Sequence, residues 1–400
     1  MARLVPDPED AGLIQEKQRQ AMRLMQSLQI DAWVIFAREG ADSTLISLIA
    51  GPERVVQNVV FILTADGQRI AILEPIDIGN GAGSHFEEVI PYENDVSGPL
   101  QQVWRRLDPR RVALNFSREH YSADGLTHGM YLRLEDMLGK EGLQGRTVSS
   151  EGLVTSLRAV KGEEELTRLK RAAEITVQLG HEMTELFKPG VTDTDLAHFV
   201  TNRAPALGAA HAFSSIRANR LGETSKGPIH KRIERGQVIV SDMGVVYRGY
   251  SSDLKRLWYV EDGDTRVFSQ LDKQWRACMS SIHKTLEILR PGLPGYEVHE
   301  VGWGELEAHG FRRSRHSYGH QVGRDVHDAG PWLGDRANRY RPAEGTLQTG
   351  MVVTLDPTIN MGGVQEPSWW CMGAECMAKV TPTGGVPLHE LQNEVWTVRF

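Results

Sequence analysis

The sequence has few cysteines and no long hydrophobic run. It contains 3 cysteines in 400 residues, too few for a disulfide framework, and Cys371 and Cys376 are not spaced like a zinc-binding pair. No window of about 18 apolar residues occurs, and the N-terminus has no apolar segment after Arg3. We therefore expect neither a membrane span nor a secretory signal, and we predict a cytoplasmic protein with reduced thiols.

The sequence also lacks an excess of basic residues. Lys and Arg together number 45 against 52 for Asp and Glu, the formal net charge is −7, and no dense basic block stands out. We therefore do not expect nucleic acid as the main partner. The composition is that of a globular protein, 40% hydrophobic and 24% charged, in a chain long enough for two domains.

The first part of the chain alternates between helix and strand patterns. A helical pattern covers residues 16–28, strand patterns cover 31–37 and 112–116, and a hairpin pattern covers 59–73. Near Val154 the pattern changes to a long amphipathic helix dense in Glu, Lys and Arg. We predict a smaller α/β domain over residues 1–154 and a second domain over residues 155–400.

The second part contains a weak internal repeat. Lys188-Pro189-Gly190 follows one long helical pattern and Arg290-Pro291-Gly292 follows another, at an offset of 102 residues. A second helical pattern follows each of these segments. Either the domain consists of two similar halves, or Pro-Gly simply ends helices wherever it occurs. These few residues leave both readings open.

Four carboxylates lie in strand contexts. Asp242 and Asp253 occupy opposite arms of a predicted hairpin over 237–260, with its turn at Arg248-Gly249. Because the two aspartates are equidistant from the point between Tyr247 and Arg248, we expect them to lie opposite or one step from opposite, about 5 Å apart, where like charges destabilise a sheet. Asp356 and Glu375 lie in apolar strand patterns, where an unpaired buried carboxylate is costly or becomes protonated.

A histidine cluster lies between these two pairs of carboxylates. The segment 316–328, HSYGHQVGRDVHD, contains three histidines among glycines. Four carboxylates and an imidazole suit divalent Mn, Co, Zn or Fe(II). Two carboxylates 4 Å apart repel by about 4 kcal/mol at an effective dielectric of 20, and two dications balance four such charges. Two ions that share a solvent molecule lower its pKa and polarise the carbonyl that it attacks.

The order and surroundings of these residues resemble a known family. The segments SDMGVVYRGYSSDLKR, HSYGHQVGRDVHDAG and GMVVTLDP look like those of the pita-bread metallopeptidases, within them aminopeptidase P and prolidase, over residues 155–400. The N-terminal part resembles the creatinase-type N-terminal domain in its layout. The resemblance implies an α+β protein, in which a pseudo-twofold pita-bread domain of curved antiparallel sheets and helices follows a smaller α/β domain.

The resemblance also implies a role for each site residue. It makes two divalent metal ions the cofactor, with Mn expected first and Co, Zn or Fe as possible replacements. The implied metal ligands are Asp242 on one ion, Asp253 and Glu375 bridging both, and His320 and Asp356 on the second. Catalytic roles fall to His316, His327 and Asp356, and a substrate contact to His230. Independently of the resemblance, four aromatic residues flank the motif segments and are candidates to line a pocket for an apolar or prolyl residue: Tyr318, Trp332, Trp369 and Trp370. Of these four we expect Tyr318 to contact the substrate.

The function implied by the resemblance is hydrolysis of the peptide bond before proline. The enzyme would act through a metal-bridging hydroxide on a small peptide with proline in the second position, as a homodimer. Three positions depart from the family pattern: Asp356 replaces a Glu, Gly373 a basic residue and Asn360 a tyrosine. Two alternatives follow, a non-peptidase hydrolase of the same fold acting on a small nitrogen compound, and a binding protein without catalysis.

Overall fold

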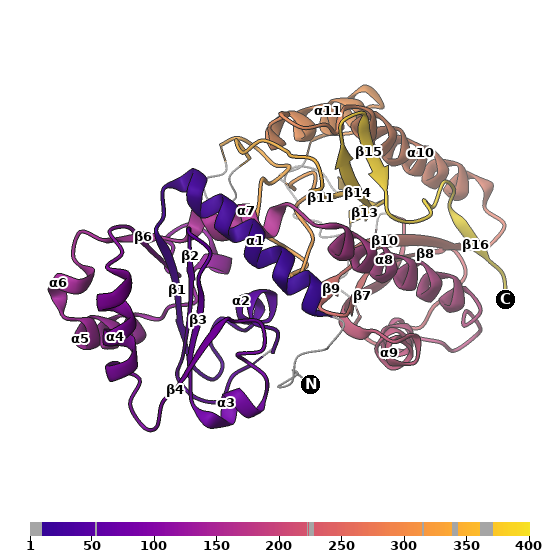
Figure 1. Cartoon of the computed structure of the whole chain (residues 1–400). Coiled ribbons are helices and arrows are strands. Elements are labelled where there is room, and N and C mark those ends of the chain that lie inside the picture. The colour runs from indigo at the N-terminus through magenta and orange to yellow at the C-terminus, as the bar shows by residue number, and fades with distance from the viewer. Residues whose placement is uncertain are drawn as a thin grey trace. The chain divides into compact units, whose positions relative to one another are not determined.

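The chain divides into two compact units, residues 1–158 and 159–400. The computed structural model describes residues 10–400 except 53, 222, 224–227, 314–315, 338–342 and 361–370. The division falls a few residues beyond Val154 because helix α7 (Glu151–Ala159) packs Leu153, Val154 and Leu157 into the core of the first unit. Figure 1 shows each unit with its own sheets and helices.

The first unit is a six-stranded mixed sheet with helices on both faces. Its strand order is β4-β3-β2-β1-β5-β6, with β1, β2 and β3 antiparallel and the remaining neighbours parallel. The strands are β1 (Ala32–Ala37), β2 (Val59–Thr64), β3 (Arg69–Leu73), β4 (Glu88–Pro91), β5 (Val112–Leu114) and β6 (Thr147–Ser149). The helices are α1 (Ala11–Leu28), α2 (Ser43–Ile49), α3 (Pro75–Gly79), α4 (Ser97–Leu107), α5 (His128–Leu138), α6 (Lys140–Leu143) and the 3₁₀ helix η2 (Tyr121–Ala123).

The central strands of this sheet are apolar on both faces. In β1, Trp33 and Ile35 pack in one core with α1, α2 and α7, whereas Val34 and Phe36 pack in a second core with α4 and α5. A strand buried on both faces reads as a continuous apolar run, which is the pattern of residues 31–37. The predicted hairpin over 59–73 is confirmed as β2 and β3.

The second unit contains the same order of elements twice. Its first half comprises α8 (Glu163–Thr184), α9 (Asp193–Arg203), the 3₁₀ helix η3 (Ala204–Leu207), β7 (Ala210–Arg220), β8 (Gln237–Tyr247), β9 (Tyr250–Ser251) and β10 (Leu254–Val260). Its second half comprises α10 (Thr265–Ile288), α11 (Gly295–Ala308), β11 (Val352–Leu355), β12 (Thr358–Asn360), β13 (Cys371–Gly373), β14 (Cys376–Thr381) and β15 (Gly384–Pro387). The last strand, β16 (Trp396–Val398), pairs with β10.

Each half of this unit is a helix pair followed by antiparallel strands. The Pro-Gly segments lie between α8 and α9 and between α10 and α11. The strand ladders are β10-β8-β7 in the first half and β11-β14-β15 in the second. The predicted pseudo-twofold arrangement is thus confirmed, and it explains the Pro-Gly repeat.

The long helix predicted from Val154 onward is interrupted. Helix α7 ends at Ala159 and α8 begins at Glu163, where the backbone N–H of Gly162 donates to the carboxylate of Glu165 at 2.8 Å. This local hydrogen bond starts a new helix, which is the first helix of the second unit. Among the described residues, no helix combines the length and the apolar character that crossing a membrane requires.

Candidate metal centre

The hairpin of β8, β9 and β10 supplies two of the predicted ligands. Arg248 and Gly249 both have positive φ, 49° and 80°, and Tyr247 pairs with Tyr250. A two-residue turn of this kind matches the twist of its strands. The register that follows pairs Asp242 with Lys255 and Met243 with Leu254. The expectation that Asp253 lies opposite Asp242 or one step away is therefore wrong, because Asp253 is two residues from that position.

Asp356 and Glu375 come from the second half of the domain. Strands β11 and β14 are antiparallel with Leu355 opposite Cys376, so Asp356 and Glu375 meet where this ladder ends. The same alignment continues into β12 and β13, where Thr358 pairs with Gly373. Both carboxylates are buried.

His320 lies on the segment that connects α11 to β11. Its backbone N–H donates to Thr354 Oγ1 at 3.2 Å, and its carbonyl accepts from the Thr354 N–H at 2.8 Å, which fixes it beside β11. Its Nδ1 lies 3.1 Å from the carbonyl oxygen of Gln321, while its Nε2 lies 3.4 Å from Asp253 Oδ2. A proton on Nδ1 leaves the Nε2 lone pair directed at the carboxylate cluster, which is the orientation of a metal-binding histidine.

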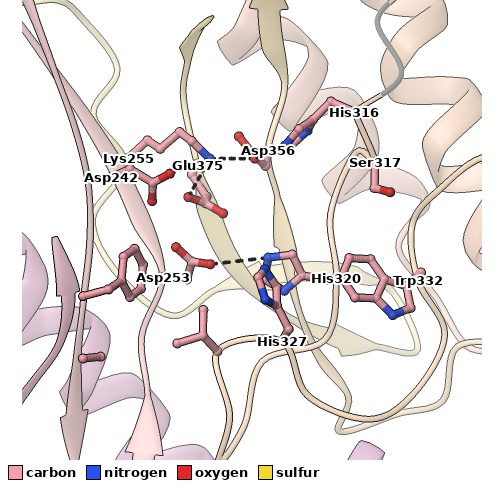
Figure 2. Close-up of a pocket in the computed structure, with 13 residues that line it drawn as sticks. Asp242, Asp253, Lys255, His316, Ser317, His320, His327, Trp332, Asp356 and Glu375 are labelled. Atoms are coloured by element: carbon pink, nitrogen blue, oxygen red, sulfur yellow. Dashed lines mark hydrogen bonds and ion pairs between the residues drawn. The ribbon is translucent and has the colours of Figure 1, made fainter. Parts of the chain in front are cut away.

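These side chains line one cavity of about 570 Å³. Figure 2 shows the carboxylates on one side of the cavity and the histidines with Trp332 on the other. Its lining residues are Ala212, Phe213, Asp242, Asp253, Lys255, His316, Ser317, His320, Val326, His327, Trp332, Asp356 and Glu375. The structure thus brings all five predicted metal ligands to the same cavity, together with His316 and His327.

A lysine lies among the carboxylates. Lys255 Nζ is 2.6 Å from Asp356 Oδ2, 3.3 Å from Glu375 Oε2 and 3.5 Å from Asp242 Oδ2. Figure 2 shows its side chain reaching between Glu375 and Asp356. The lysine side chain is only 12% exposed, so its charge lies inside the site and is balanced there.

Burial acts to raise the pKa values of Asp242, Asp356 and Glu375, whereas the charge of Lys255 acts to lower them. Burial raises the pKa of Asp242 to about 6, and Asp253 and Asp356 add to that rise while Lys255 opposes it. Burial and the charge of Asp253 likewise raise the pKa of Glu375. Burial would raise the pKa of Asp356 too, but the charges of Lys255 and His316, with hydrogen bonds from Lys255 and Thr358, together outweigh burial and lower that pKa. Asp356 is consequently held as an anion.

The two histidines with predicted catalytic roles both border the cavity. His316 is about half exposed, and its Nε2 lies 3.7 Å from Asp356 Oδ2. The ring of His327 lies 4.4 Å from that of His320, centroid to centroid, in a T-shaped arrangement. Trp332 contacts both His320 and His327, with centroid distances of 5.3 Å and 5.7 Å. Trp332 therefore forms an apolar wall next to the imidazoles.

The two residues predicted to contact the substrate, Tyr318 and His230, lie outside the lining of this cavity. Tyr318 is fully buried in the core, where its hydroxyl lies 2.7 Å from Ser281 Oγ and 3.3 Å from Thr285 Oγ1. His230 is exposed on the loop before β8, and its backbone N–H donates to Thr194 Oγ1. Neither residue lines the cavity. Trp369 and Trp370 lie outside the described residues.

Comparison with known proteins identifies the family. The model of metallopeptidase family M24 matches residues 167–390, more than half of the chain. The chain belongs to this family. A Xaa-Pro dipeptidase of Pyrococcus horikoshii is 29% identical over 224 residues, which are 54% of this chain and 60% of that protein. A methionine aminopeptidase of Buchnera aphidicola is 25% identical over 51% of this chain and 78% of its own length.

The similarity in structure extends beyond the region matched in sequence. The crystal structure of the dipeptidase PepE from Mycobacterium ulcerans superimposes with a TM-score of 0.77 at 20% identity. The superposition covers 98% of this chain and 99% of that one. This M24 chain therefore shares its fold with that protein in both units, including the α/β unit that lies outside the family match.

Sequence reasoning missed Lys255. The signal that could have found it is the turn itself, because Arg248-Gly249 as the two central residues sets the register and places Lys255 opposite Asp242. Cross-strand neighbours share a face of the sheet. A lysine opposite a site aspartate therefore has to point toward that site.

Proposed function

We propose that this M24 protein is a metal-dependent peptidase that cleaves the bond before proline in short peptides. The observation that carries the proposal is the convergence of four carboxylates and His320, from both halves of the domain, on one cavity of about 570 Å³. The Pyrococcus horikoshii relative, a Xaa-Pro dipeptidase, suggests the substrate class. Mn is the ion we expect first, with Co, Zn or Fe as possible replacements.

The donor atoms fit a divalent cation. Two groups of three residues offer ligand atoms that all lie within 4.8 Å of one another, namely Asp242 with Asp253 and Glu375, and Asp253 with His320 and His327. Oxygen and imidazole ligands in such groups suit Mn, Zn, Co or Fe(II). A divalent cation held there would act as a Lewis acid and would lower the pKa of a water molecule.

The remaining residues of the cavity provide binding and proton transfer. Trp332, Phe213 and Val326 offer apolar surface for a pyrrolidine ring. His316 and Asp356 lie side by side at the cavity, at 3.7 Å, and can share a proton next to the scissile bond. Asp356 is anchored by Lys255 and accepts from Thr358 Oγ1 at 2.9 Å, so we assign the movable proton to His316.

Peptide assays with defined metal content test this proposal. We expect protein treated with chelator to be inactive, and added Mn to restore cleavage of Xaa-Pro dipeptides or tripeptides. Matched Xaa-Ala peptides serve as the control for proline specificity. The variant Asp253→Asn should lose both metal and activity, because Asp253 belongs to both ligand groups.

Two outcomes would contradict the peptidase. Tight metal binding without cleavage of any proline peptide would favour a hydrolase acting on a small nitrogen compound. Failure to bind Mn, Co, Zn or Fe would favour a binding protein of the same fold. The homodimer and the cytoplasmic location remain predictions, for which sedimentation and cell fractionation are the direct measurements.

A further inference from the structure

We infer that the ammonium group of Lys255 takes the place of one of the two expected metal ions, and that the centre holds a single divalent ion on Asp253, His320 and His327. The inference rests on the metal dependence proposed above but not on the substrate. It gives His327 the role of a metal ligand, whereas the resemblance makes it a contact for the substrate.

The strand register directs the lysine into the site. Lys255 is the direct partner of Asp242 on the antiparallel pair β8 and β10, and direct partners project from the same face of a sheet. Asp253 is two residues from Lys255 and therefore faces the same way. The position of the ammonium group is thus a consequence of the backbone pairing and needs no unusual side-chain path.

The ammonium group donates two hydrogen bonds, to Asp356 and Glu375, and forms a longer ion pair with Asp242. It has three protons, and it lies between 2.6 Å and 3.5 Å from oxygens of three different carboxylates, Asp242, Asp356 and Glu375. An ammonium group has no lone pair and cannot bind a metal. An ion on these same oxygens would have to displace a cation that is covalently attached to β10.

The other ligand group makes no direct ion pair with the lysine, although Asp253 lies near enough to feel its charge. Asp253, His320 and His327 offer atoms within 4.8 Å of one another, and among the described residues the ion pairs of Lys255 include none of these three. Two imidazoles and one carboxylate form a common protein site for a divalent ion with open positions. Figure 2 shows Asp253, His320 and His327 grouped apart from Lys255.

Repulsion between cations also favours one ion. The lysine already places one positive charge among Asp242, Asp356 and Glu375. A second dication bound to those carboxylates would lie beside the ammonium group, which repels it. The chain therefore supplies one cation itself.

Metal counting tests the inference directly on the full-length protein. We expect wild-type protein saturated with Mn and then desalted to contain one ion per chain by elemental analysis. Its Mn spectrum in electron paramagnetic resonance should show an isolated ion. Lys255→Arg, which keeps the charge, should also retain one ion. Lys255→Met, which removes the charge, should bind a second ion, so that its spectrum shows two magnetically coupled Mn ions.

Matched controls separate this effect from general damage. Lys379→Met removes a lysine from neighbouring strand β14, outside the cavity, and should leave one ion. His327→Ala should weaken Mn binding by about tenfold or more. Unchanged Mn affinity in His327→Ala, with only turnover affected, would overturn its role as a ligand.

Two results would overturn the role of Lys255. Wild-type protein with two coupled Mn ions would show that the lysine replaces none, and protein that binds no ion at saturation would remove the centre altogether. If Lys255→Met fails to fold, the counts for wild type and Lys255→Arg still decide. Because counting needs no turnover, failure to cleave Xaa-Pro peptides would refute the proposed substrate and leave this inference standing.

Discussion

Asp356 is the ligand position at which this chain departs most from the family pattern. An aspartate reaches about 1.5 Å less far than a glutamate, and both oxygens of Asp356 are already engaged, by Lys255 and by Thr358. Neither group of closely spaced ligand atoms includes it. Asp356 therefore holds the lysine in place, and we expect the metal to bind Asp253 instead.

Asp42, in the first unit, gives a pH-dependent test of a single residue. It precedes α2 with φ of 56°, and its Oδ2 accepts from Asn115 Nδ2 at 2.6 Å. Burial raises its pKa from 3.8 to about 6, against the opposing effect of Asn115. Between these two values the folded chain keeps a proton that the unfolded chain has lost, so stability falls as the pH rises.

We expect Asp42→Asn to remove this loss. Relative to wild type, its free energy of unfolding should increase between about pH 4 and about pH 7 by on the order of 2–3 kcal/mol, as measured by urea denaturation. Asp66→Asn is a control of opposite sign, because hydrogen bonds from Thr64 and Gln68 lower the pKa of Asp66. Parallel pH profiles for wild type and Asp42→Asn would contradict the prediction.

The sequence pattern identified the metal-site residues better than the substrate contacts. Asp356 and Glu375 stood out because a carboxylate in an apolar strand needs a partner, a rule that depends on neighbouring residues alone. His230 was assigned through resemblance and Tyr318 because it is an aromatic residue within the histidine segment, and the surroundings of both depend on contacts far along the chain. Tyr318 turns into the core because its hydroxyl forms a hydrogen bond with Ser281 and its ring packs against Gly302 of α11.

At the scale of elements, helix α11 positions the histidine segment through Gly302. A Cβ atom on Gly302 would lie 2.2 Å from Tyr318 Cε2, a distance that two such carbon atoms cannot adopt. Tyr318 is two residues before His320 and is fixed to α10 by its bond to Ser281. The missing side chain at Gly302 thus lets the tyrosine ring pack against the helix.

We expect Gly302→Ala to destabilise the protein by about 1–3 kcal/mol, because the added methyl group overpacks a buried contact. Gly304→Ala in the same helix is the matched control, since a Cβ there meets no atom within 4 Å. That control should gain about 0.5–1 kcal/mol from the lower flexibility of alanine. Thermal denaturation of the two variants measures the difference, and equal melting temperatures would refute the packing argument.

The hairpin shows which part of an element was beyond sequence reasoning. The strands and their turn residues were recognised, but the register was placed one residue early in the turn. A single residue in the turn moves each cross-strand partner by two positions, which replaced Lys255 by Asp253 opposite Asp242. Alternation of side chains survives such a shift, so the pattern of apolar residues could not reveal it.

At the scale of the whole molecule, the two units have separate cores, and among the described residues the candidate metal-ligand groups lie in the second unit. The cores of residues 1–158 lie on the two faces of one sheet. The cores of residues 159–400 lie under the helix pairs of the two halves. Ligand binding stabilises the structure that contains the site.

Hydrogen exchange can show this division. Saturating Mn should slow amide exchange in β8, β10, β11 and β14, by up to about 2.7 kcal/mol of added protection at a concentration 100 times the dissociation constant. The amides of β1 and β2 should exchange at the same rate with Mn and with chelator. Exchange is measured by mass spectrometry of peptic fragments. Equal slowing of exchange in both units would contradict this prediction.

The internal lysine bears on how the protein matures after synthesis. A cluster of acidic groups without any counterion would oppose closure of the two strand ladders around it, whereas Lys255 is present from the moment β10 is translated. We therefore expect the newly made polypeptide to complete its tertiary structure without a transition metal. Metal binding would then follow folding as a separate step.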